Sequence, residues 1–258
     1  MEQFKLGSRY YYATLSTQNQ IIYRKIYNQW SKGMSNAEIE IDTDEWEAYY
    51  GLSLHNLSER IIDDNPHLFH LETSNISYTR LNNKVGIEME PLYTSKEYRK
   101  IYNDLIRVTK KILSSPVMQG SDIQKIKYLH DYLAETIIYG SEENDKKSTR
   151  EAYTIVGALL KRKCVCSGYA RAMRLLCDLS HISCIVVSGV GSDETSTGRH
   201  AWNIVKFNKG IYHIDVTWDS NLKQPNKAAQ KYFLKSDEFF KHDHRWDYKF
   251  YPKCPSNY

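Results

Sequence analysis

The sequence has no apolar run long enough to cross a membrane. None approaches the roughly 20 residues that a spanning helix needs, and the opening segment Met1–Arg9 lacks the apolar core of a secretory signal. We therefore expect no membrane partner. The expected location is cytoplasmic if Met1 is the native start, and secreted or cell-surface if a leader has been removed.

Charge of one sign is not concentrated anywhere in the chain. The net charge of +4 comes from 35 basic and 31 acidic residues, and the densest basic run is only Lys161–Lys163. This balance gives no indication of nucleic-acid binding, so no nucleic-acid partner is expected. The 41% apolar content is ample for a buried core, which excludes a disordered chain.

Cysteine is scarce and lacks metal-ligand spacing. Five cysteines leave at least one thiol unpaired and do not form a disulfide framework. Cys164 and Cys166 lack the second cysteine pair that structural zinc needs. The histidine-containing run Lys241–Arg245 has no matching ligands elsewhere, and we expect it on a solvated helix end. No metal and no organic cofactor are predicted.

Apolar residues recur at helical spacing in several segments. Ser16 is a candidate N-cap for the first, and Ser121 and Ser148 each begin a capping-box spacing. The predicted helices cover residues 16–30, 95–113, 121–137 and 148–160, with a fifth that begins at Cys166. We expect one face of this fifth helix to be buried and the face with Arg171, Arg174 and Asp178 to lie in water.

Strand patterns fall into two groups. Short alternating segments at 69–72, 76–80 and 85–89 indicate a small antiparallel ribbon, and residues 182–188, 199–207, 211–218 and 232–234 indicate four further strands. The predicted fold is α+β, with the cysteine-bearing helix packed on an antiparallel sheet. We place a boundary near residue 116, between a mainly helical region with a β ribbon (1–115) and a catalytic core (116–258). A single fold with an N-terminal elaboration fits equally well.

Three segments of the second half carry thiol chemistry: Cys166–Ala170, His200–Asn203 and Asp215–Asp219. A thiol, an imidazole and a carboxylate are the parts of a nucleophilic acyl-transfer site. A helix start at Cys166 favours the thiolate and offers N–H groups to an oxyanion, and the small Ser167 and Gly168 leave room for a substrate carbonyl. Each residue alone fits an ordinary core role, so the joint arrangement carries the prediction.

The strand pairing can be tested against this site. The turn between the strands of His200 and Asp215 centres on Asn208–Gly210. An even-numbered loop puts both side chains on one face, whereas a three-residue loop puts them on opposite faces. The triad therefore predicts an even loop. Trp202 then shares the face of His200, as a candidate cleft wall or a core residue, and the glycine-containing segment Gly189–Gly198 is predicted as a mobile flap beside His200.

These motifs, together with Lys127–Tyr132, Glu151–Thr154 and Tyr232–Ser236, resemble the transglutaminase-like superfamily over residues 121–240. The resemblance implies a papain-like core in which Cys166, rather than Cys164, is the nucleophile. It also implies that His200 is the base and that Asp215 orients it. The paired CxxC zinc motif of the peptide N-glycanase branch is missing from the sequence, which makes deglycosylation a poor expectation.

The expected activity is acyl transfer on a peptide or protein amide, such as a glutamine side chain, through a Cys166 thioester. The expected partners are a peptide or protein substrate and a primary-amine acceptor. A cysteine protease or deamidase, with water as acceptor, is the first alternative. A non-catalytic binding or scaffold module on the same fold is the second. The sequence gives no oligomeric state.

Overall fold

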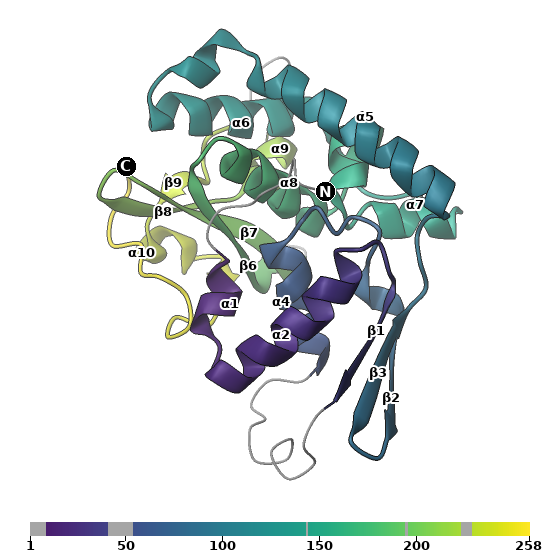
Figure 1. Cartoon of the computed structure of the whole chain (residues 1–258). Helices are drawn as coiled ribbons and strands as arrows, with labels where there is room; N and C mark the ends of the chain where they lie inside the picture. The colour runs from purple at the N-terminus through teal and green to yellow at the C-terminus, as the bar shows by residue number, and fades with distance from the viewer. Residues whose placement is uncertain (1–8, 41–53, 143, 194–195, 223–228) are drawn as a thin grey trace.

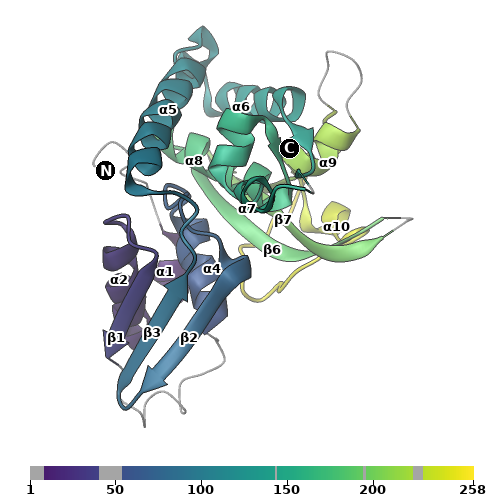
Figure 2. The same ribbon diagram turned by 90° about the vertical axis from the view of Figure 1, so that its right-hand side faces the viewer.

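The computed structural model describes residues 9–40, 54–142, 144–193, 196–222 and 229–258. Over this part of the chain, one half combines helices with a three-stranded sheet, and the other packs helices on a five-stranded sheet (Figures 1 and 2). Both sheets are antiparallel. The predicted α+β class is confirmed. Among the described residues, no helix is long and apolar enough to cross a membrane.

In its described residues, the N-terminal half holds three helices and the sheet β1-β3-β2. Its elements are α1 (Tyr10–Thr14), α2 (Thr17–Trp30), β1 (Asn36–Glu40), α4 (Leu54–Asp64), β2 (Ile76–Leu81) and β3 (Lys84–Met89), with a 3-10 turn, η2 (Thr73–Asn75). Ser16 caps α2 by accepting a hydrogen bond from the backbone of Asn19 at 3.3 Å, as predicted. The ribbon of β2 and β3 is also confirmed, but the strand expected at 69–72 is wrong, because residues 69 and 70 form a turn and residues 71 and 72 have no regular structure. The sequence predicted neither β1 nor α4.

The C-terminal half holds six helices among its described residues. They are α5 (Ser95–Leu113), α6 (Asp122–Thr136), α7 (Lys146–Glu151), α8 (Cys166–Leu179), α9 (Val216–Asn221) and α10 (Asp237–Phe240), with the turns η3 (Pro116–Gln119) and η4 (Gly157–Lys161). The helix predicted at 148–160 is partly wrong. It begins after an Asp145 cap and ends at Glu151, and a π-helical turn follows.

The five-stranded sheet has the order β10-β6-β7-β8-β9. Its strands are β6 (Ser183–Ser192), β7 (Thr197–Phe207), β8 (Gly210–Ile214), β9 (Phe233–Lys235) and β10 (His244–Arg245), and a short parallel pair, β4 (Ile138–Tyr139) and β5 (Lys163–Cys164), lies apart. Phe207 pairs with Gly210 across a two-residue loop, so the predicted even loop is confirmed. The strand expected at 211–218 is too long, because it ends at Ile214 and α9 follows.

Among the described residues, the two largest hydrophobic clusters fill the two halves. One joins α2, α4 and the three-stranded sheet. The other is built on α6 and α8 and includes Leu105 and Ile112 of α5, together with Phe69, Leu92 and Tyr93. Helix α5 therefore packs in the core of the C-terminal half, on the N-terminal side of the boundary placed at residue 116.

The polar face of α8 is buried, contrary to the expectation that it lies in water. Arg171, Arg174 and Asp178 are each less than 10% exposed. Arg171 Nε donates to Asp63 Oδ1 of α4 at 2.8 Å, and Arg174 pairs with Asp178 at 3.3 Å along the helix. Charged residues are rarely this buried unless they are paired. The expectation failed because α4, which supplies Asp63, was not foreseen.

Candidate active site

Cys166, His200 and Asp215 come together at one edge of the α8–sheet packing. Cys166 is the first residue of α8, His200 lies on β7, and Asp215 follows β8 as the N-cap of α9. The Nε2 atom of His200 lies 2.6 Å from Oδ2 of Asp215. Because Nε2 faces the carboxylate, Nδ1 is the ring nitrogen left for Cys166.

The electrostatics of this group favour a charged thiolate and imidazolium. Burial raises the pKa of the Cys166 thiol, but the hydrogen bond and charge of His200, together with the Ala201 N–H, lower it below that of an ordinary thiol. Burial lowers the pKa of His200, but the charge of Asp215 and hydrogen bonds to Asp215 and Cys166 raise it to about 10. The start of α8 adds its own partial positive charge at the sulfur.

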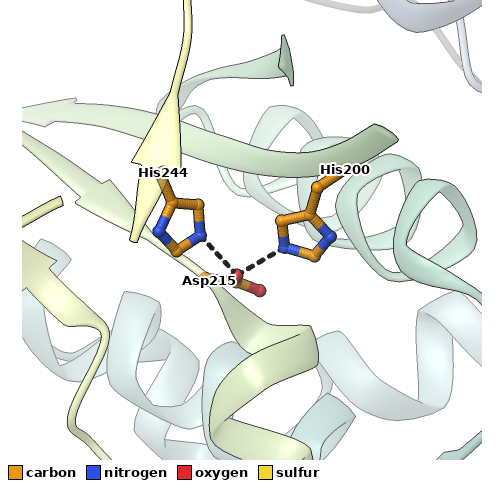
Figure 3. A group of neighbouring side chains, drawn as sticks. All are labelled: His200, Asp215 and His244. Atoms are coloured by element: carbon orange, nitrogen blue, oxygen red, sulfur yellow. Dashed lines mark hydrogen bonds and ion pairs between the residues drawn. The ribbon is translucent and has the colours of Figure 1, made fainter. Parts of the chain in front are cut away.

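The Asp215 carboxylate is fixed by three partners. Its Oδ1 accepts from the backbone N–H of Trp218 at 3.0 Å, and its Oδ2 lies between Nε2 of His200 and Nε2 of His244, the latter at 3.1 Å (Figure 3). Asp215 is fully buried. Burial raises the pKa of this carboxyl, but the two histidines lower it well below its usual range. The carboxylate therefore stays charged and oriented.

His244 is a residue that sequence reasoning missed. We expected Lys241–Arg245 on a solvated helix end, yet His244 is fully buried on β10. β10 adds to the edge of the five-stranded sheet by pairing with Gly191 and Val190 of β6. This pairing turns the ring inward to Asp215, while the neighbouring His242 is exposed.

A cleft of about 770 Å³ opens over Cys166 and His200. One wall is α4, with His55, Glu59 and Asp63, and aromatic rings of Tyr139 and Tyr153 line another part. Arg199 of β7 reaches across to Glu59, with its Nη2 3.0 Å from the carboxylate. The N-terminal half therefore forms part of the site, a role that the sequence did not reveal.

Trp202 lies beneath the site and is absent from the cleft lining. It is 1% exposed, its ring stacks on His200 with centroids 5.9 Å apart, and its indole N–H donates to Nδ1 of His213 at 3.0 Å. Trp202 is therefore a core residue, as one of the two alternatives predicted, and it does not form a wall of the cleft. A large aromatic ring on the inner side of His200 limits the movement of the imidazole.

Gly168 and Gly191, which lie near the site, pack tightly and leave no open space. A Cβ on Gly168 would lie 2.5 Å from the carbonyl oxygen of Ala152, and one on Gly191 would lie 3.2 Å from Cγ of His200. Gly168 therefore lets α8 pack closely and does not make room for substrate. The flap expected at 189–198 is also wrong for its described ends, because Gly189–Ser192 and Thr197–Gly198 pair as strands.

In the part of the chain that the structure describes, two clusters bring potential metal-ligating atoms within 4.8 Å of one another: His200, Asp215 and His244, and His213, Asp237 and Cys254. In the first cluster, His200 and His244 both form hydrogen bonds to the same oxygen of Asp215. In the second, the Trp202 N–H occupies Nδ1 of His213, which places the neutral ring's own proton on Nε2 facing Asp237. Hydrogen bonding alone accounts for both arrangements.

Residues 112–216 match the family model of the transglutaminase-like superfamily, Transglut_core. This segment contains Cys166, His200 and Asp215 and is similar to that superfamily. The superfamily includes transglutaminases and proteases that act through cysteine. No curated protein matches the chain.

Several solved structures are similar to this chain at low identity. A structure described as a TGase has 16% identity and a TM-score of 0.39, over 70% of this chain and 50% of that one. A "Putative Cysteine Protease" from Cytophaga hutchinsonii has 12% identity and a TM-score of 0.35, over 55% and 61% of the two chains. Menin, in a structure that reveals its binding site for the Mixed Lineage Leukemia protein, has 16% identity and a TM-score of 0.31, over 55% and 30%. The alignment spans half the length of the first.

Proposed function

We propose that the protein is a thiol-dependent acyltransferase that acts on a peptide or protein amide, such as a glutamine side chain, through a thioester on Cys166. The observation that carries the proposal is the placement of Cys166 and His200 together at an open cleft, where His200 lowers the pKa of the thiol and Asp215 lies 2.6 Å from the imidazole. An inert core thiol needs none of these features.

The proposed reaction has two stages. The Cys166 sulfur attacks the amide carbon, and the oxyanion that forms lies near the N–H groups of the first turn of α8. His200 gives its proton to the leaving nitrogen as the C–N bond breaks, which leaves a thioester and neutral imidazole. His200 then takes a proton from the incoming acceptor, which attacks the thioester and releases Cys166.

Two ion pairs in the cleft lining support a neutral amide as the substrate group. Arg171 pairs with Asp63, and Arg199 pairs with Glu59. These four residues line the cleft as mutually neutralised pairs. Exposed tyrosines beside Cys166 add surfaces that suit a polypeptide, because a tyrosine ring offers both an apolar face and a hydroxyl.

The test is mass spectrometry of a glutamine-rich protein incubated with the enzyme, with and without a primary-amine probe. A Cys166→Ala variant serves as the control. Amine incorporation that disappears in the variant would establish transglutamination, and Cys166-dependent deamidation or backbone cleavage would establish the hydrolase alternative. Products that persist in Cys166→Ala would contradict both.

Thiol labelling separates the enzyme from a scaffold protein. The other four cysteines, Cys164, Cys177, Cys184 and Cys254, are fully buried. If the protein is an enzyme, we therefore expect one rapidly alkylated cysteine, Cys166, at mildly acidic pH, where ordinary thiols are protonated. A scaffold predicts no such site, and fast labelling of Cys164 or Cys184 would count against the assignment.

A further inference from the structure

His244 occupies an unusual position for a buried histidine. Both of its ring nitrogens face carboxylates: Nε2 lies 3.1 Å from Asp215 Oδ2, and Nδ1 lies 2.7 Å from Asp243 Oδ1. Each neutral imidazole has one N–H, so bonding to two carboxylates requires both nitrogens to donate. Asp243 is in turn held by the hydroxyl of Tyr232 at 2.7 Å.

The Asp215 oxygen that His244 contacts is the one that faces His200. Oδ2 therefore receives both imidazoles, while Oδ1 is occupied by the Trp218 N–H. Figure 3 shows the two rings on opposite sides of the carboxylate. The carboxylate cannot rotate without breaking one of these bonds. A hydrogen-bonded chain thus runs from Asp243 through His244 and Asp215 to His200.

We infer that His244 is a positioning residue of the active site: it locks the Asp215 carboxylate against His200 and so maintains the reactive pair of His200 and Cys166. The inference deepens the proposed function and rests on it. It places a fourth, sequence-distant residue behind the triad. It also assigns a role to β10, the short edge strand that carries His244.

A purely structural role is the competing explanation, because the His244 ring also packs among aromatic residues. Its centroid lies 4.3 Å from that of Trp218, 4.5 Å from Phe240 and 4.8 Å from Trp202. The chain offers a matched control in His213. His213 is equally buried, packs on the same Phe240 and Trp202 rings, and bonds a carboxylate, Asp237, through Nε2, but it does not contact Asp215 in the structure.

The experiment measures the rate at which iodoacetamide alkylates Cys166 in the full chain at mildly acidic pH. In this reaction the thiolate sulfur forms a bond to carbon and iodide leaves. It needs no amide substrate, so its result stands even if the proposed function fails. His244→Phe keeps an aromatic ring and removes both hydrogen bonds. We expect it to slow alkylation about tenfold, comparable to the loss of an outer-shell partner at a metal site.

Two variants test whether the hydrogen bond is responsible. His244→Gln retains an N–H that can reach Asp215, and we expect it to recover most of the rate. His213→Phe should lower the melting temperature to a similar degree while it keeps the wild-type rate. A wild-type rate in His244→Phe, an equal loss in His213→Phe, or no recovery in His244→Gln would overturn the inference.

Asp243→Ala provides a second route should His244→Phe fail to fold. The Asp243 side chain is 21% exposed, so its removal disturbs the core less. It frees Nδ1 of His244, and we expect an intermediate loss of the alkylation rate. An unchanged rate in Asp243→Ala, with His244→Phe unfolded, would show that the contact is structural only.

Discussion

At the scale of single residues, the ion pair of Cys166 and His200 sets the pH range of activity. The pKa of the thiol is lowered and that of His200 is raised to about 10. On the acid side of the pH profile, activity should therefore appear at a pH below about 8.5, the pKa of an ordinary thiol. It should be lost on the alkaline side near pH 10, where His200 gives up the proton that the leaving nitrogen needs. The two apparent values belong to the pair and not to either residue alone.

The check is a pH–rate profile of amide turnover, with Asp215→Asn beside the native protein. Asparagine keeps an oxygen for the Trp218 N–H but removes the charge that raises the pKa of His200. We expect the alkaline limb to move to lower pH and the maximum to fall about 10²- to 10⁴-fold. An alkaline limb that stays in place would contradict the role given to Asp215.

Residue roles were predictable where they follow from local position, and not where they depend on distant packing. The approach of His200 to Asp215 follows from one strand register, and that register was predicted from the turn. The orientation of His244 depends instead on an edge strand of two residues that pairs with β6, more than 50 positions earlier in the sequence. Its large apolar neighbours, Phe240 and Trp246, were the available signal of burial.

At the scale of elements, the ion pair of Asp63 and Arg171 joins the helix of the nucleophile to the cleft wall. Both side chains are less than 10% exposed. Asp63→Ala would leave the Arg171 guanidinium buried and without its carboxylate. We expect a loss of about 3–5 kcal/mol in the free energy of unfolding, measured by urea denaturation.

A matched control is Glu38→Ala, which removes the exposed pair of Glu38 and Lys84 on the three-stranded sheet. Solvent-exposed pairs contribute little, so no measurable change in stability is expected. Equal effects of the two substitutions would mean that the contact between α4 and α8 contributes no more than a surface pair.

Helices with clean apolar periodicity were predictable, and α4 was not, for a physical reason. Helices α5 and α6 keep one apolar stripe and begin with capping boxes, which marks their ends. Helix α4 buries Ser58, Asp63 and Asp64 along with its apolar residues, because it packs on the polar face of α8 and on the tyrosines of α1. Buried polar residues that form hydrogen bonds between two elements give the same sequence pattern as a solvent-exposed helix face.

At the scale of the whole molecule, both halves contribute residues to the larger hydrophobic core and to the lining of the cleft. The larger hydrophobic cluster includes Phe69, Leu92 and Tyr93 from before α5, and α5 itself supplies Leu105 and Ile112. The cleft likewise has residues of α4 opposite Cys166. The sequence alone could not show this, because the change in patterning near residue 116 marks where the motifs begin and not where the core ends.

These five residues give the boundary at residue 116 a direct test. A fragment of residues 116–258 lacks all of them, and burial of each such side chain stabilises a fold by roughly 1.5–3 kcal/mol. Their sum is comparable to the roughly 5–15 kcal/mol that holds a typical domain together. We expect this fragment to show no cooperative thermal transition by circular dichroism. A fragment of residues 91–258 restores all but Phe69 and should melt cooperatively, below the full chain. A cooperative melt of 116–258 that matches the full chain would instead establish an independent domain.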